Sequence, residues 1–283
     1  MSTWLITGAS SGIGAILADL ALQAGHTVIA TARDPIKAAQ AYPAIEKQGG
    51  KWLKLDVTRP ETQQEVTEVI KQHGGIDVLV NNAGYSILGA VEDMSEEEIH
   101  QQIDTNLYGP IRTIKAALPF MREKKSGTIV NVSSIAGLHA RATCSLYSAS
   151  KFALEGFSEA LAEDLASFNI RVLLVEPGAF RTNFLGAAQF PAAGLNPAYR
   201  DTIVDKGLQA FRDADGKQIG DPAKAAQRIF EVVDGSGMAE GKAGLLRLPL
   251  GKDCLTRART KIDGLLRNLE EMEEIALSTD CDQ

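Results

Sequence analysis

The chain has 283 residues, of which 45% are hydrophobic and 23% charged, a balance that is ordinary for a globular protein with a large core. Its net charge of −7 and pI of about 5.2 give it no basic surface for binding nucleic acid or an anionic membrane. Its three cysteines, Cys144, Cys254 and Cys281, form no CxxC pair, which excludes a disulfide framework and a structural zinc site.

These cysteines indicate a reducing compartment, and we expect a cytoplasmic protein. No apolar run approaches the ~20 residues of a membrane span, and no secretory signal is evident. The four histidines show no metal-ligand spacing, so we expect no metal site.

In the first half of the chain, short apolar runs alternate with helical patterns, as in βαβ units with right-handed crossovers. The predicted strands are Trp4–Thr7, Thr27–Thr31, Trp52–Asp56, Val78–Asn81, Thr128–Val132 and Val172–Glu176. The predicted helices are Ile13–Ala24, Glu61–His73, Ile103–Met121 and Leu146–Ala166. Because the strands are apolar throughout rather than alternating, both faces of the sheet are expected to be covered. The pattern predicts an α/β, doubly wound parallel sheet, that is, a Rossmann fold.

The segment Phe184–Asp221 interrupts this rhythm with prolines, glycines and weak helical stretches, and it predicts a mobile excursion from the sheet. A helix over Pro222–Val233 and a last strand within Leu245–Leu250 follow. The tail from Lys252 to Leu277 carries apolar residues at helical spacing, which favours a helix packed on the surface over an isolated coiled coil. We therefore expect one domain over residues 1–250, including the excursion 184–221, and a helical extension over 251–283.

A glycine-rich turn follows the first strand, with the spacing Gly-x-x-x-Gly-x-Gly at Gly8, Gly12 and Gly14. Small residues let the backbone approach a pyrophosphate, and the helix that follows offers free N–H groups at its positive end. The strand before the turn and the helix after it favour a dinucleotide site over a bare turn.

The same turn also fits Gly-x-Ser-x-Gly, the nucleophile elbow of an α/β-hydrolase, with Ser10 as nucleophile. Two observations disfavour that alternative. An elbow this early leaves no preceding strands to build an oxyanion hole, and the last histidine is His139, too early for the order of a hydrolase triad.

The second predicted strand is followed by Arg33 at its tip, where an enzyme that selects NAD usually carries a carboxylate. A guanidinium suits the 2′-phosphate of NADP through charge-assisted bonds, and Ser10 in the facing turn could add a hydroxyl. Asp34 is one residue past the tip and reads as a turn residue before Pro35. The alternative is that Arg33 is only a solvated charge; we favour NADP.

Tyr147 and Lys151 are four residues apart and share one face of a predicted helix. A free tyrosine has a pKa near 10, and a neighbouring ammonium lowers it, which is the role expected for Lys151. Ser134 follows a strand whose carboxyl end opens onto the ligand crevice of a doubly wound sheet, so it can hydrogen-bond a substrate oxygen.

With these motifs in place, residues 3–183 resemble a short-chain dehydrogenase/reductase of the compact type, in the retinol/17β-hydroxysteroid dehydrogenase-like branch. The resemblance implies a catalytic tetrad of Asn106, Ser134, Tyr147 and Lys151, in which Asn106 holds a water leading from the lysine. It also implies a cofactor site to which Tyr147 and Lys151 contribute, and whose other members are Gly8, Ser10, Ser11, Gly12, Ile13, Gly14, Arg33, Asp56, Val57, Asn81, Asn82, Ala83, Gly84, Pro177, Gly178, Phe180 and Thr182.

In that family, hydride passes between NADPH and a carbonyl carbon while the tyrosine donates a proton as general acid. We expect a hydrophobic ketone or its alcohol as the substrate, beside Ser134 and Tyr147 and with walls from Tyr85, Leu88, Leu138, His139, Phe180 and Phe184. The resemblance further suggests a homodimer or homotetramer built on Ile103–Met121 and Leu146–Ala166. The remaining alternative is a redox-responsive regulatory protein that uses NADPH occupancy as a signal. The intact pattern disfavours it, because such a protein has no need to keep Tyr147 and Lys151 together.

Overall fold

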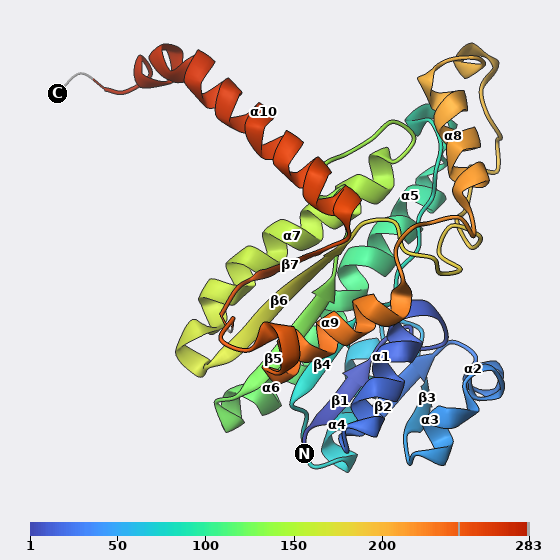
Figure 1. Cartoon of the computed structure of the whole chain (residues 1–283), viewed down its shortest axis with the longest axis vertical. Helices are drawn as coiled ribbons and strands as arrows, with labels where there is room; N and C mark the ends of the chain where they lie inside the picture. The colour runs from blue at the N-terminus through green and yellow to red at the C-terminus, as the bar shows by residue number, and fades with distance from the viewer. Residues whose placement is uncertain (243, 282–283) are drawn as a thin grey trace.

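A seven-stranded parallel sheet organises the molecule, and the computed structural model describes residues 1–242 and 244–281 (Figure 1). The strand order is β3-β2-β1-β4-β5-β6-β7, and every pairing is parallel. The strands are β1 (Thr3–Ile6), β2 (Thr27–Ala32), β3 (Lys51–Lys54), β4 (Val78–Asn81), β5 (Gly127–Val132), β6 (Ile170–Pro177) and β7 (Arg247–Leu250). The predicted Rossmann fold is confirmed, and all seven predicted strands are present with small shifts at their ends.

Helices cover both faces of this sheet, as the continuous apolar strands predict (Figure 1). They are α1 (Gly12–Gln23), α2 (Pro35–Ala41), α3 (Pro43–Lys47), α4 (Thr62–Gln72), α5 (Glu96–Ile103), α6 (Gly109–Lys124), α7 (Ser145–Leu165), α8 (Ile203–Ala214), α9 (Pro222–Asp234) and α10 (Lys252–Leu277). Short 3₁₀ turns lie at Val91–Asp93, Ile135–Gly137, Ala166–Phe168, Pro197–Tyr199 and Gly237–Ala239. None of the helices among the described residues is both long enough and apolar enough to cross a membrane.

The core has two layers, one on each face of the sheet. Side chains of α1 and α9 pack on one face, where Leu17 and Ile229 meet strand residues such as Val80. Side chains of α4, α6 and α7 pack on the other, where Ile70 and Met121 are fully buried. The chain reverses its winding between β1 and β4, so the carboxyl ends of these neighbouring strands open a crevice, the usual ligand site of such sheets.

Two helical predictions need correction. The single helix expected over Ile103–Met121 is divided, because a π-helical turn at Asp104–Tyr108 joins α5 to α6. The tail is helical over Lys252–Leu277 as predicted, but the expectation that it packs on the surface is wrong. Beyond its first three turns the helix leaves the body, and every described residue from Ile262 onward is exposed (Figure 1).

The excursion Phe184–Asp221 is folded rather than irregular. It contains the turn Pro197–Tyr199 and the helix α8, whose Leu208 is buried against Leu88 and Cys144. Its two ends are tied to the body by isolated bridges, Ile87 to Gln189 and Phe180 to Gly220. Its predicted mobility stays a prediction.

Candidate active site

The glycine turn between β1 and α1 is shaped by positive backbone φ angles, +63° at Gly8 and +55° at Gly12. Side chains rarely adopt such angles, which explains glycine at both positions. At Gly14 the constraint is space, because a Cβ there would lie 2.4 Å from the Asn82 amide nitrogen. Asn82 in turn donates to the carbonyl oxygens of Thr7 and Gly8, at 3.0 and 2.9 Å, and so ties the turn to the end of β4.

The first turn of α1 is suited to an anion. Its N-cap residue, Ser11, makes no side-chain capping bond, and no acidic side chain lies in that turn. Its backbone donors and positive dipole end are therefore available to a phosphate, as a dinucleotide site requires. Ser10 and Ser11 are exposed beside it, and a Cβ on Gly12 would lie 3.3 Å from the Thr182 side chain, so the segment after β6 reaches this turn.

Arg33 follows the tip of β2 and is exposed, near enough to Asp56 to help lower the pKa of that carboxyl. Burial acts most strongly on the Asp56 pKa, in the raising direction, but hydrogen bonds from Thr58 outweigh it and the net shift is downward. Asp34 accepts a 3.1 Å bond from the backbone N–H of Lys37 and caps α2. The carboxylate of Asp34 is thus engaged in a helix cap, and Arg33 is the exposed charged residue directly after the tip of β2.

The four residues from Asn81 to Gly84, which follow from the end of β4, have different surroundings. Asn81 is buried, donates to the Asn131 Oδ1 at 2.8 Å and accepts from Thr113 at 2.5 Å, so its side chain links β4 to β5 and α6. That side chain is buried and steadies the sheet, and its predicted place beside the cofactor stays a prediction. Gly84 lies beside two residues of the predicted tetrad, since a Cβ there would be 3.1 Å from the Asn106 Oδ1 and 3.7 Å from the Lys151 Nζ.

The π-helical turn places Asn106 at the crevice, fully buried. Its Nδ2 donates to the Tyr85 carbonyl and to the Ser150 hydroxyl, both at 3.0 Å, and its Oδ1 accepts from the Tyr85 N–H at 3.2 Å. The side chain is therefore occupied by protein partners, which the sequence did not reveal. A π-helical turn inside a helix is frequent at functional sites.

The structure brings together Ser134, Tyr147 and Lys151. Tyr147 and Lys151 face the same way on α7, and Ser134 follows β5, near enough to the Tyr147 phenol to act on its pKa. The Lys151 Nζ donates to the Val132 carbonyl at 2.8 Å, at the end of β5. The ring of Phe184 lies 5.8 Å from that of Tyr147, centroid to centroid, which places the excursion over the tyrosine.

Burial sets the protonation of both groups on α7. It raises the pKa of Tyr147 to about 12, although the nearby Ser134 hydroxyl acts in the opposite direction. It lowers the pKa of Lys151 to about 8, against the attraction of Glu155 one turn further along. The expected lowering of the Tyr147 pKa by Lys151 is not found, because removal of the phenol from water dominates.

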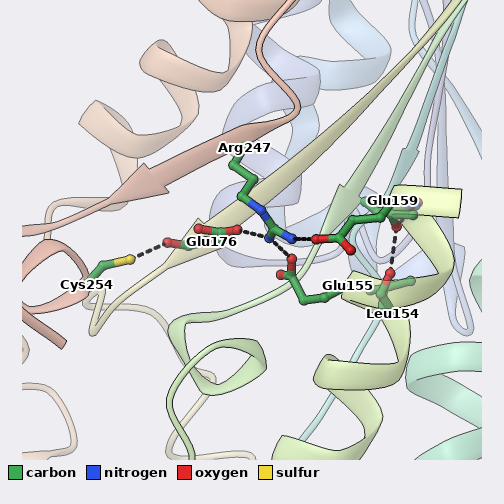
Figure 2. Close-up of polar contacts among 8 residues, drawn as sticks. Leu154, Glu155, Glu159, Glu176, Arg247 and Cys254 are labelled. Atoms are coloured by element: carbon green, nitrogen blue, oxygen red, sulfur yellow. Dashed lines mark hydrogen bonds and ion pairs between the residues drawn. The ribbon is translucent and has the colours of Figure 1, made fainter. Parts of the chain in front are cut away.

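An ion-pair cluster that sequence analysis missed includes Glu155, one turn along α7 from Lys151 (Figure 2). Arg247 of β7 reaches three carboxylates: Glu155 and Glu159 on α7, and Glu176 on β6 at 2.6 Å. The Glu155 and Glu176 side chains are only 6% and 2% exposed, so Arg247 is what compensates their charge. A local sequence signal was Glu176, an acidic residue near the end of the largely apolar β6.

The residues predicted to form the walls of the substrate pocket lie in different parts of the structure. Tyr85 is half-buried, and Leu138 lies on the short turn after Ser134. Leu88 packs in the core of the excursion, and the Phe180 ring packs against Gly220 and the main core. The carbonyl of His139 accepts from Arg257 of α10 at 2.6 Å, so that residue supports the tail helix.

Other predicted residues serve as connections. Gly178 follows β6 and has no room for a side chain, since a Cβ would overlap the Asp253 carboxylate; Pro177 is the last residue of that strand. Val57 is buried under Gly109, and its carbonyl accepts from Arg112 at 3.0 Å. Ala83 donates its backbone N–H to the Thr7 hydroxyl, and Ile13 packs against the core.

Comparison with known proteins agrees with this geometry. Residues 2–190 match the family model described as short chain dehydrogenase. The chain is 52% identical over 208 residues to oxidoreductase claN of Passalora fulva, covering 73% of this chain and 94% of that protein. It is 38% identical to human retinol dehydrogenase 8 over 82% of this chain and 77% of that one, which supports the predicted branch.

Solved structures give the same result. A short-chain dehydrogenase from Streptomyces avermitilis superposes with a TM-score of 0.87 at 40% identity, over 99% of this chain and 100% of that one. A short-chain dehydrogenase from Sphingobium yanoikuyae in complex with NADPH has a TM-score of 0.70 at 25% identity, over 96% of each chain. These matches overturn the hydrolase alternative, and Ser10 belongs to a nucleotide-binding type of turn. The chain therefore belongs to the short-chain dehydrogenase family of oxidoreductases, and solved structures similar to it contain bound NADPH.

Proposed function

We propose that the protein reduces the carbonyl of a hydrophobic small molecule to a secondary alcohol, with NADPH as the reductant, and that it can run the reverse reaction. The observation that supports this most strongly is the joint placement of Ser134, Tyr147 and Lys151 at the carboxyl end of β5, beside Gly84 and an uncapped helix terminus. A bound nicotinamide supplies the hydride that the carbonyl carbon receives.

The chain's own residues supply the proton and the orientation. Burial keeps the Tyr147 pKa at about 12, so the phenol is protonated at neutral pH and can donate to an alkoxide as it develops. The Ser134 hydroxyl, held beside the phenol, orients and stabilises the same oxygen. Lys151, held on the Val132 carbonyl, carries positive charge below pH 8 and stabilises the phenolate that remains after proton transfer.

The role of Asn106 is narrower than the sequence predicted. Its side-chain amide is already bonded to Tyr85 and Ser150, so the group it can offer a relay water is its backbone carbonyl, inside the π-helical turn. Glu155 supports the charged form of Lys151 from the neighbouring turn of α7.

We infer a preference for NADP over NAD from the tip of β2. Arg33 offers a guanidinium that suits a 2′-phosphate, while Asp34 is occupied as the cap of α2. Fluorescence titration with NADPH and NADH tests this: wild type should favour NADPH, and Arg33→Ala should lose that preference. Equal affinities in wild type would contradict it.

Phe184 and α8 support a hydrophobic substrate, because they bring an apolar segment over Tyr147. The direct test is NADPH consumption by the purified protein with a panel of alkyl and aryl ketones, with ester substrates as the control. We expect turnover with ketones alone. Tight NADPH binding without turnover on any ketone would favour the regulatory alternative.

A further inference from the structure

The helix α10 leaves the body in a fixed direction. Three bonds hold its start: the Cys254 thiol donates to the Glu176 carbonyl at 3.0 Å, Asp253 accepts from the Ala179 N–H at 2.9 Å, and Arg257 donates to His139. From Ile262 to Leu277 the side chains are all exposed, and Figure 1 shows this part extending away from the sheet.

This outer part lacks the packing that normally stabilises a helix. A helix of about 15 residues is marginal in water without tertiary contacts, and Gly264 in its interior costs roughly 1 kcal/mol relative to alanine. The segment nevertheless presents large apolar side chains to solvent, with Leu269 70% exposed and Ile262 54% exposed. Both observations indicate that another surface covers this helix.

The spacing of the apolar residues shows what kind of surface fits. They recur in alternating steps of three and four, which is the a and d pattern of a coiled coil sustained over three heptads. The seam consists of Leu255, Ala258, Ile262, Leu265, Leu269, Met272 and Ala276. Leu266 and Ile275 widen it. A seam of this kind fits a second helix that carries the same repeat.

The charge distribution along α10 indicates which helix could pair with it and in which orientation. The first half of α10 is mainly basic, with four cationic side chains and two aspartates, and the second half is mainly acidic, with one arginine and four glutamates. The cations of the first half are Lys252, Arg257, Arg259 and Lys261, and the glutamates of the second are Glu270, Glu271, Glu273 and Glu274. Two copies in parallel would align like charges, whereas two antiparallel copies set each basic half against an acidic half. With five basic and six acidic side chains in all, the helix has no net positive charge to attract an anionic membrane.

We propose that α10 is a dimerisation element, which pairs antiparallel with α10 of a second copy of this chain. In an antiparallel pair, each residue at heptad position a faces a residue at position d of the other helix. Aligning Leu265 with Leu269 of the second copy therefore also sets Ile262 against Met272. That register brings Arg259 beside Glu273 of the second copy, twice by symmetry, with Leu266 against its own counterpart at the two-fold axis. This interface is distinct from one built on α6 and α7.

Charge reversal tests the pairing by sedimentation equilibrium. Arg259→Glu and Glu273→Arg should each halve the molecular mass relative to wild type, and the double variant should restore it. The matched controls are Arg267→Glu and Glu274→Arg, which lie on the opposite face of the helix and should leave the mass unchanged. An unchanged mass for both single variants, or a double variant that fails to recover, would overturn the proposal.

Cross-linking tests the direction. In a Cys281→Ser background, Leu266→Cys should give covalent dimers with a short bismaleimide, while Thr260→Cys on the outer face should not. A parallel pair would place the two 266 positions on opposite sides and give no product. Binding of wild type to anionic vesicles, with a mass unaffected by Arg259→Glu, would assign the seam to a lipid surface and contradict the proposal.

Discussion

Replacing Arg247 by methionine should destabilise the fold strongly, because it removes the guanidinium that forms ion pairs with two buried carboxylates. Glu155 and Glu176 are almost fully buried, and removing one partner from a buried ion pair typically costs about 3–5 kcal/mol. The Glu159 contact adds little, since that side chain is 58% exposed and such pairs contribute about 0–1 kcal/mol. At roughly 2 °C per kcal/mol for a large domain, the melting temperature should fall by at least about 6 °C.

The loss of stability caused by Arg247→Met should depend on pH, because the pKa of Glu176 depends on Arg247. Burial raises the pKa of Glu176, and repulsion from Glu155 adds to the effect, while Arg247 opposes both. Without the arginine, the folded state binds more protons than the unfolded state above pH ~4.5, so its free energy of unfolding falls as pH rises. The loss caused by Arg247→Met should therefore be larger at pH 8 than at pH 5.

Urea denaturation at both pH values measures this loss, with the triple variant Arg247→Met, Glu155→Gln, Glu176→Gln as the control. The triple variant should regain most of the stability because the unpaired charges are gone. A loss below about 1 kcal/mol, or one that is equal at the two pH values, would refute the reasoning.

Two further predictions concern the site. Gly14→Ala should abolish NADPH binding and lower the melting temperature, because its Cβ would overlap the Asn82 amide; retention of wild-type affinity in a titration would contradict the assigned close packing. Lys151→Met should eliminate turnover yet raise the free energy of unfolding at pH 7 by up to about 3 kcal/mol, because burial lowers the folded-state pKa to about 8 from 10.5. The free energy of unfolding of wild type should fall by this amount as pH falls from 10.5 through 8, whereas that of the variant should not change for this reason. Urea titrations of both proteins at pH 7 and pH 10 measure the difference. The same difference at both pH values would exclude this explanation.

The parts of the fold that the sequence predicts are those set by local pattern. Apolar runs, helical spacing and the glycine turn located the strands, most of the helices and the crevice at Gly8 and Ser134. The π-helical turn was missed, and its residue Asn106 bonds to Tyr85, 21 residues away, a contact that no local pattern indicates.

Features that depend on distant partners were also out of reach. Arg247 meets Glu155 across 92 residues, and nothing in the local sequence of either indicates the other. The Tyr147 pKa was predicted to fall because the charge of Lys151 is visible in the sequence, whereas the burial that outweighs it is not. The apolar repeat of α10 predicted a helix correctly, but a repeat does not say which surface covers it.

The central claim is that Tyr147 donates the proton in carbonyl reduction, and Tyr147→Phe tests it most directly. NADPH affinity and NADPH consumption with the best ketone should be measured on the same preparation, beside wild type. The account predicts unchanged affinity and a rate lower by a factor of about 10² to 10⁴, the usual contribution of a general acid. A phenylalanine variant that keeps most of its activity would contradict the assignment of Tyr147 and the mechanism built on it.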